Sequence, residues 1–173
     1  MKALVVYESM FGNTQSIAEE IVAGMSETID AECVEVGGAP ALPEGLDLLV
    51  VGGPTHQFGL SRPDSRKGAT SETEEPLVSQ GIGIREWLTG LPKVAGDATA
   101  TFDTSIRKPN LPGSAARGAQ KRLKRLGYRI VMPAEIFHVE ATTGPITDGE
   151  LERARTWAGL LLKPCARPHG PNA

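Results

Sequence analysis

The chain has 173 residues, of which 40% are hydrophobic and 23% charged, and its formal net charge at pH 7 is −3. This size and composition are typical of one globular domain that buries a substantial core. The apolar runs are strand-sized, the first strand begins almost at once, and the chain has 2 cysteines, so we expect a cytoplasmic protein without a membrane span, signal peptide, disulfide framework or metal site.

The first predicted element is a buried strand that ends at Tyr7 and leads through a short turn into a helix. Apolar residues recur at helical spacing between residues 15 and 25, which predicts the helix. The turn, from Ser9 to Thr14, has hydroxyl and amide side chains but no lysine or arginine. Because a helix N-terminus leaves backbone N–H groups unpaired and carries partial positive charge, the turn suits a phosphate held by neutral donors. The alternative is an ordinary turn capped by Ser or Asn.

A second strand and a second turn follow. Residues 32–36 alternate as an edge strand does, and residues 37–45 are typical of a loop. Residues 46–51, which are apolar apart from Asp47, predict another buried strand, which leads into the sequence Gly52-Gly53-Pro54-Thr55-His56-Gln57-Phe58-Gly59. Residues 60–80 are polar and charged, which predicts a long loop, and loops of this length usually carry function.

The alternation of helices and strands continues after residue 80. Residues 84–91 predict a helix that turns Trp87 inward, and residues 98–102 predict a short strand. A third turn, Asp103-Thr104-Ser105, follows this strand and lies on the same rim as the first two. Three polar turns at the ends of three predicted strands therefore gather at one edge of the sheet.

The last elements complete one domain of residues 1–163. Ser114 is placed to cap a helix that ends at Gly127, and residues 129–139 predict a last strand interrupted near Pro133. Thr147 or Asp148 is placed to cap the final helix. Residues 164–173 are rich in proline and glycine, and we expect them to be disordered.

The first two turns resemble those of the flavodoxin family. Ser9, Gly12 and Thr14 match the family's phosphate loop, whereas Phe11 stands where a hydroxyl is common. Gly52-Gly53-Pro54-Thr55 is similar to the family's Gly-x-Pro-Thr turn, which packs against the isoalloxazine ring. The first turn has neither the Gly-Lys-Ser/Thr of a Walker A loop nor the three-glycine spacing of a dinucleotide fingerprint. The resemblance covers nearly the whole chain.

The resemblance implies an α/β fold: a flavodoxin-like, doubly wound, five-stranded parallel sheet of order 2-1-3-4-5 in three layers, α/β/α. Ligands of such sheets bind beyond the carboxyl ends of the strands where the strand order reverses, a rule for which flavodoxin itself is a standard example. The resemblance therefore implies bound FMN. The expected cofactor-binding residues are Ser9, Met10, Phe11, Gly12, Asn13 and Thr14 for the phosphate, Pro54, Thr55, His56, Gln57, Phe58 and Gly59 for one wall of the ring site, and Thr101, Phe102, Asp103 and Thr104 for the pyrimidine edge.

Three functions are compatible with these residues. The first is an FMN-binding electron-transfer protein that serves a redox partner protein. The second is an FMN-dependent NAD(P)H:quinone-type oxidoreductase, because residues 54–59 are similar to the Pro-Thr-Arg-Phe-Gly loop of quinone reductases. The third is a flavodoxin-fold binding or regulatory module without FMN, because few aromatic residues can stack on a ring: Trp87 and Trp157 are predicted in helix cores. No catalytic or metal-binding residue is assigned.

Charge is distributed unevenly along the chain. Residues 1–60 contain nine acids and one base, whereas residues 105–129 contain eight bases and no acid. The simplest interpretation is one solvated helix face. The functional interpretation is a basic rim near the flavin, which suits an acidic partner or the phosphates of a nicotinamide dinucleotide. No recognition motif for nucleic acid accompanies the basic residues, which disfavours nucleic acid as a partner. The rim would comprise Arg62, Arg66, Lys67, Arg107 and Lys108.

Overall fold

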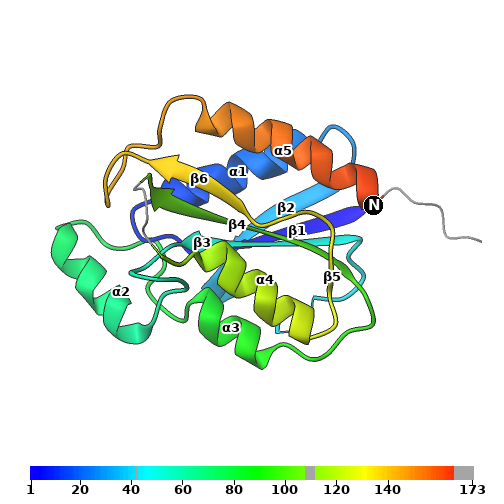
Figure 1. Ribbon diagram of the computed structural model, residues 1–173, viewed down its shortest axis with the longest axis horizontal. Helices are drawn as coiled ribbons and strands as arrows, with labels where there is room; N and C mark the ends of the chain where they lie inside the picture. The colour runs from blue at the N-terminus through cyan, green and yellow to red at the C-terminus, as the bar shows by residue number, and fades with distance from the viewer. Residues whose placement is uncertain (42, 108–111, 166–173) are drawn as a thin grey trace, which may run out of the picture.

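The computed structural model describes residues 1–41, 43–107 and 112–165, which form alternating strands and helices (Figure 1). Two short 3-10 turns, Val36–Gly38 and Thr70–Glu72, join the regular elements. The strands are β1 (Lys2–Tyr7), β2 (Asp30–Glu35), β3 (Leu48–Pro54), β4 (Ala98–Ile106), β5 (Arg129–Ile130) and β6 (Glu135–Val139). The helices are α1 (Asn13–Met25), α2 (Pro63–Ala69), α3 (Ile84–Gly90), α4 (Ala115–Arg125) and α5 (Glu150–Cys165).

The strands form a single parallel sheet of order β2-β1-β3-β4-β5, and β6 also pairs with β4. The strands β5 and β6 are thus two halves of one edge strand, which is interrupted at residues 131–134. Pro133 lies in this interruption, as the sequence predicted, because proline has no N–H to donate to a ladder. The expected strand order 2-1-3-4-5 is confirmed.

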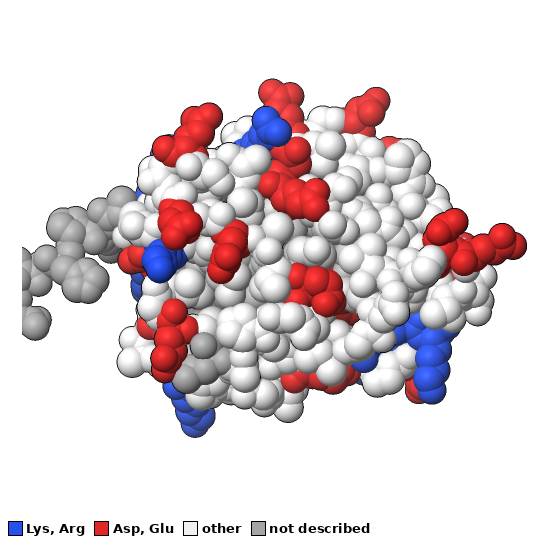
Figure 2. Space-filling view, turned by 180° about the vertical axis from the view of Figure 1, so that it is seen from behind, with Lys and Arg blue, Asp and Glu red and all other residues white. Residues whose placement is uncertain are grey.

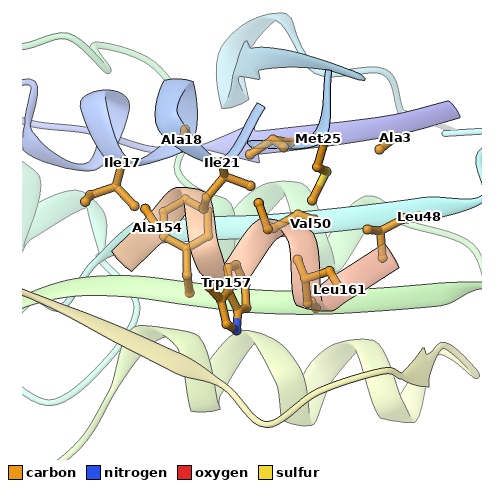
Figure 3. Close-up of a cluster of buried hydrophobic side chains, with 14 of the residues drawn as sticks. Ala3, Ile17, Ala18, Ile21, Met25, Leu48, Val50, Ala154, Trp157 and Leu161 are labelled. Atoms are coloured by element: carbon orange, nitrogen blue, oxygen red, sulfur yellow. The ribbon is translucent and has the colours of Figure 1, made fainter. Parts of the chain in front are cut away.

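One face of the sheet is covered by α1 and α5 (Figure 1). Figure 3 shows Ile17 and Ile21 of α1 and Trp157 and Leu161 of α5 around Val50 of the central strand β3. Trp157 is 4% exposed and packs edge-to-face against two phenylalanine rings at centroid distances of 6.0 and 6.4 Å. Its expected place in a helix core is confirmed.

The other face of the sheet is covered by α3 and α4. Trp87 is 5% exposed in this second core, and its indole N–H donates to the carbonyl of Pro40 at 3.0 Å. Both tryptophans are therefore packing residues. The Ser114 hydroxyl accepts from the Arg117 N–H, which confirms the predicted cap of α4, and Gly127 follows the helix with a φ of 95°. Glycine adopts this left-handed conformation without strain.

The third predicted turn is wrong, because β4 continues through residues 103–105 to Ile106. Asp103 and Thr104 pair with Gly53 and Pro54 of β3, and the residues of β4 up to Ile106 also pair with β6. Strand pairing on both sides keeps these polar residues in the sheet. The loop after β4 therefore begins at Arg107, four residues later than expected.

Residues 60–80 also differ from the predicted long loop, because they contain α2 and the 3-10 turn Thr70–Glu72. The helix α2 lies beyond the carboxyl ends of β3 and β4, on the left in Figure 1. Pro63 is its first residue, a position that proline favours because its φ is already helical. The final helix α5 extends to Cys165, and residues 166–173 lie outside the described residues. Within the described ranges, no helix has the length and apolar character that crossing a membrane requires.

The close contact between β3 and β4 gives a test of the core. A Cβ added at Gly52 would lie 2.1 Å from the ring of Phe102, which is fully buried. We expect Gly52→Ala to lower the free energy of unfolding by about 1–3 kcal/mol, because the ring cannot move without disturbing the core. Urea denaturation monitored by tryptophan fluorescence measures this change.

Gly159 provides a matched control for this substitution. It is exposed in the interior of α5, and no atom of the residues that the structure describes lies within 4 Å of an added Cβ, apart from its own helix backbone and chain neighbours. We expect Gly159→Ala to raise the free energy of unfolding by about 0.5–1 kcal/mol, because alanine loses less backbone entropy in a helix. Equal unfolding midpoints for the two variants would contradict the packing that we describe.

Candidate functional site

A cleft of about 1010 Å³ lies at the carboxyl ends of β1, β3 and β4. It is formed by the turn after β1, the turn after β3, the end of β4 and the helix α2 with the 3-10 turn that follows. The strand order reverses between β1 and β3, so this is the position at which open α/β sheets bind ligands. The lining residues that the sequence predicted are Ser9, Met10, Phe11, Asn13, Thr14, Pro54, Thr55, His56, Gln57, Phe58 and Thr104.

The turn after β1 presents an uncapped helix N-terminus to the cleft. Gly12 precedes α1 with a φ of 89°, and no side chain in the described part of the chain caps the helix. The Ser9 hydroxyl accepts from the Gly12 N–H at 3.1 Å, and the first turn of α1 contains no acidic residue. The first N–H groups of a helix have no partner within it and carry partial positive charge. The lining residues Asn13 and Thr14 thus belong to the part of α1 that favours an anion.

The outer side of this turn is held by the segment that follows α2. The Ser79 N–H donates to the Ser9 carbonyl at 2.8 Å, the Ser9 N–H donates to the Ser79 hydroxyl at 3.0 Å, and the Val78 N–H donates to the Met10 carbonyl at 3.0 Å. The Ser79 hydroxyl in turn donates to Glu35 at the end of β2, at 2.6 Å. Backbone groups on the outer side of the turn are therefore paired.

The turn after β3 is a tight hairpin closed by two backbone hydrogen bonds between His56 and Gly59, of 2.8 and 2.9 Å. Gln57 has a φ of 46°, which only glycine adopts without strain, and Phe58 is 67% exposed beside it. Burial, with a further contribution from Arg66, lowers the pKa of His56. The imidazole is therefore uncharged at neutral pH.

The start of α4 supports this hairpin from behind. The Ala115 N–H donates to the Thr55 hydroxyl at 2.9 Å. Gly113, with a φ of 94°, packs so closely that an added Cβ would lie 2.1 Å from the carbonyl oxygen of Phe58. The position of the hairpin therefore depends on the loop before α4 as well as on β3.

The end of β4 contributes one of its four predicted residues and two that were not predicted. Thr104 lines the cleft, and its hydroxyl lies 2.7 Å from the buried Thr14 hydroxyl. Thr101, Phe102 and Asp103 are fully buried and do not line it. In their place Ser105 and Ile106 reach the cleft, because β4 is longer than predicted.

The side chains of Phe102 and Asp103 serve the fold behind the cleft. The Phe102 ring packs against Phe137 at a centroid distance of 6.1 Å, so it is no candidate for a ring contact. Asp103 accepts hydrogen bonds from the Ser114 hydroxyl at 2.5 Å and from the Ala116 N–H at 2.9 Å, and thus holds the start of α4. Burial raises the pKa of the Asp103 carboxyl, against the effect of these hydrogen bonds.

Gly12 and Gly59 shape two of the turns without lining the cleft. Sequence reasoning also missed the wall that α2 forms. The proline at the first position of α2 is a helix-start signal that could have indicated it. Two further lining residues come from the end of β6: Val139 is its last residue, and Thr142 lies in the loop that follows. The missed lining residues are Arg62, Asp64, Ser65, Gly68, Ala69, Glu72, Ser105, Ile106, Val139 and Thr142.

A buried carboxylate connects this wall to the turn after β1. Glu8 is 1% exposed and immediately precedes Ser9. It accepts hydrogen bonds from the Ser61 hydroxyl and, at 2.9 Å, from the Ile84 N–H at the start of α3. Arg66 of α2 donates to the same Ser61 hydroxyl at 2.8 Å and forms an ion pair of 3.1 Å with Glu86 of α3. The starts of α2 and α3 are thereby tied to the residue before the turn.

The fold resembles those of solved flavodoxins. The chain superposes on a flavodoxin from the domain Archaea with a TM-score of 0.65 and 19% identity, covering 96% of this chain and 100% of that one. Oxidised Flavodoxin 2 from Bacillus cereus gives a TM-score of 0.68 and 20% identity over 94% of this chain and 98% of that one. A flavodoxin described as a WrbA-like protein, from Agrobacterium tumefaciens, gives a TM-score of 0.60 and 17% identity over 95% of this chain and 96% of that one.

Comparisons of the sequence itself found no match: no protein-family model and no curated protein matches the chain. The structural likeness therefore establishes a flavodoxin-like fold, with a parallel sheet of the same order. The strands and turns that surround the cleft belong to this fold.

The buried Glu8 carboxylate predicts a particular dependence of stability on pH. Burial raises the pKa of Glu8, and the hydrogen bonds from Ser61 and Ile84 only partly oppose this. A carboxyl whose folded-state pKa lies above its unfolded value stabilises the protein below that unfolded value, and this contribution is lost as the pH rises through the folded pKa.

We therefore compare the native chain with Glu8→Gln, which cannot titrate at this position. The difference in free energy of unfolding, native minus variant, should fall as the pH rises from about 4, by up to about 1.4 kcal/mol per pH unit between the two pKa values. Chemical denaturation at a series of pH values measures this difference. A difference that grows with pH would show that the ionised carboxylate is the stabilising form.

Proposed function

We propose that the cleft binds FMN non-covalently and that the protein transfers electrons through it. The observation that carries this proposal is the uncapped N-terminus of α1, which opens on the cleft between Ser9 and Thr14. A phosphate monoester would replace the missing cap by accepting hydrogen bonds from the first N–H groups of the helix. The absence of an acidic residue from the first turn removes a competing anion.

The residues of the turn fit such a phosphate. The Thr14 and Thr104 hydroxyls lie 2.7 Å apart, so one of the two donates to the other and the second keeps its hydrogen for a further acceptor. Asn13 adds an amide, while the paired outer groups of Ser9 and Met10 hold the turn in shape. Neutral donors in a partly buried site form charge-assisted hydrogen bonds to a phosphate.

The rest of the cleft fits a flat ring system. Its volume of about 1010 Å³ is at the upper end of the range in which proteins enclose small ligands. The hairpin from Thr55 to Phe58 forms one wall and α2 the other, while Ser105 and Ile106 form the floor at the end of β4. FMN supplies the redox chemistry when bound, and the chain contributes binding, orientation and exclusion of water. His56, uncharged at neutral pH, adds no positive charge to this wall.

A second candidate is an FMN-dependent NAD(P)H oxidoreductase. One observation favours it: the exposed cation Arg62, which immediately precedes α2, lines the cleft, where a dinucleotide phosphate could contact it. Anaerobic addition of NADH or NADPH to the FMN-loaded protein separates the two functions. Loss of the flavin absorbance without any partner protein supports the oxidoreductase, and unchanged absorbance supports the electron carrier.

The decisive test of FMN binding uses Thr14→Val, which keeps the shape of the side chain and removes its hydroxyl. We expect the affinity for FMN to fall about tenfold to hundredfold, because a hydrogen bond to a charged group contributes about 1.5–3 kcal/mol. The affinity for riboflavin, which has no phosphate, should stay the same. Quenching of flavin fluorescence on titration of the apoprotein measures both affinities.

Thr156→Val is the matched control, because the exposed Thr156 hydroxyl donates to the Glu152 carbonyl of its own helix, at 3.1 Å. It should change neither affinity. A properly folded native chain that takes up no FMN would overturn the proposal and leave a flavodoxin-fold module that works without the cofactor. An equal loss of riboflavin and FMN affinity in Thr14→Val would contradict the assignment of the phosphate position.

A further inference from the structure

The exposed side of α4 and the start of β5 carry a cluster of cations. We call it the α4 basic surface, and it comprises Arg117, Lys121, Lys124, Arg125 and Arg129. All five side chains belong to exposed residues. Among the described residues none of the five forms an ion pair, whereas Arg66, Arg153 and Arg155 elsewhere all do.

The stability of the helix does not explain this arrangement. Like charges three or four residues apart on a helix each cost about 0.2–0.5 kcal/mol, and Lys121 has such neighbours at Arg117, Lys124 and Arg125. Cations in the last turn are favourable for the helix dipole, but Arg117 lies in the first turn, where a cation is unfavourable. A surface that weakens its own helix is better explained by what it binds.

The α4 basic surface is also concave. A groove of about 600 Å³ runs between α4 and the link from β5 to β6, with Arg117, Lys121 and Lys124 on one side. Its other side is apolar and consists of Ile130, Val131, Met132 and Pro133. The Gln120 amide donates to the Met132 carbonyl at 3.2 Å and so joins the two sides. Cations beside apolar side chains suit a protein segment that is both acidic and apolar.

This surface begins at the candidate cofactor cleft. The first residue of α4, Ala115, bonds the cleft residue Thr55, and the loop before α4 packs on Phe58. Two further exposed cations flank the mouth: Arg62 lines the cleft, and Arg107 follows the cleft residue Ile106. Positive charge thus extends from the mouth of the cleft along the length of α4.

The opposite side of the molecule is acidic. Figure 2, seen from behind, shows Asp and Glu side chains scattered over that face, while α4 lies toward the viewer in Figure 1. The net charge of −3 therefore conceals a strong separation of charge between two faces. Such a separation orients the protein in the field of a charged partner before contact.

We propose that the α4 basic surface docks an acidic protein with a one-electron redox centre, which accepts electrons at the mouth of the cleft. This proposal rests on the proposed function. The reduced cofactor loses one electron for each electron that the partner's centre gains, and no bond in the chain forms or breaks. The α4 helix alone is about 16 Å long at 1.5 Å per residue. This length exceeds the length of cationic surface that the diphosphate of one dinucleotide would contact, so the surface suits a protein better than a nicotinamide dinucleotide.

Two small oxidants of opposite charge test the surface directly. The FMN-loaded protein is reduced and mixed in a stopped-flow instrument with ferricyanide, an anion, or with hexaammineruthenium(III), a cation. We expect the rate with ferricyanide to fall about tenfold between low ionic strength and about 0.5 M salt, and the rate with the ruthenium complex to rise. The opposite dependence, which the net charge alone would give, overturns the proposal.

Two double variants with the same net charge localise the effect. Lys121→Glu with Lys124→Glu changes α4 only, and neither residue lines the cleft. Lys2→Glu with Lys163→Glu makes the same change in total charge at the start of β1 and near the end of α5. The first variant should lose the salt dependence with ferricyanide, and the second should keep it. Equal behaviour of the two variants overturns the proposal.

A measurement that needs no cofactor separates the two proposals. A fluorescently labelled decaglutamate peptide should bind the apoprotein in low salt, and the α4 double variant should bind it at least about tenfold more weakly. Duplex DNA that binds more tightly than this peptide would assign the surface to nucleic acid and overturn the docking proposal. A folded chain that takes up no FMN overturns both proposals, whereas FMN uptake without peptide binding overturns the docking surface alone.

Discussion

The structure depends on one constraint, which is that the turn between β1 and α1 must hold its shape while the first N–H groups of the helix stay unpaired. Backbone groups away from the cleft are therefore bonded elsewhere. Ser9 and Met10 bond residues 78–79, the Glu8 N–H bonds the Gly52 carbonyl at 3.0 Å, and the Glu8 side chain bonds the start of α3. A turn fixed in this way can receive an anion without reorganising, which lowers the cost of binding.

The wall formed by α2 is attached in an unusual way. Its apolar contact with the turn is small and consists mainly of Met10, Ala69 and Leu77. The remaining attachment is polar and depends on the buried Glu8, the Ser61 hydroxyl and the Arg66 guanidinium. Burying a charge costs free energy unless hydrogen bonds compensate, so this network contributes geometry more than stability. A change in either helix α2 or α3 would therefore reach the turn after β1 through Glu8.

Local sequence patterns predicted the elements that depend on near neighbours. The strand, turn and helix around Ser9 and the cap at Ser114 follow from residues within a few positions of one another. The length of β4 could not be predicted in this way, because pairing with β3 and β6 decides it. The role of residues 60–80 was hidden for the same reason, since their partners Glu8 and Glu35 lie far away in the sequence. The assignment of Phe102 to the site was wrong, because the register of β4 decides to which face of the sheet its side chain points, and local sequence does not show that register.

The helix α4 connects the two surfaces that define the proposed activity. Its first turn is held by Asp103 and Thr55, and through Thr55 it contacts the hairpin that contains Phe58. Its exposed side carries the cations that we assign to docking. A partner that presses on this side therefore acts on an element whose other end supports the wall of the cleft. That wall includes Gln57, whose φ of 46° is uncommon for a residue other than glycine, so the hairpin depends on the support that Ala115 and Gly113 give it from the start of α4.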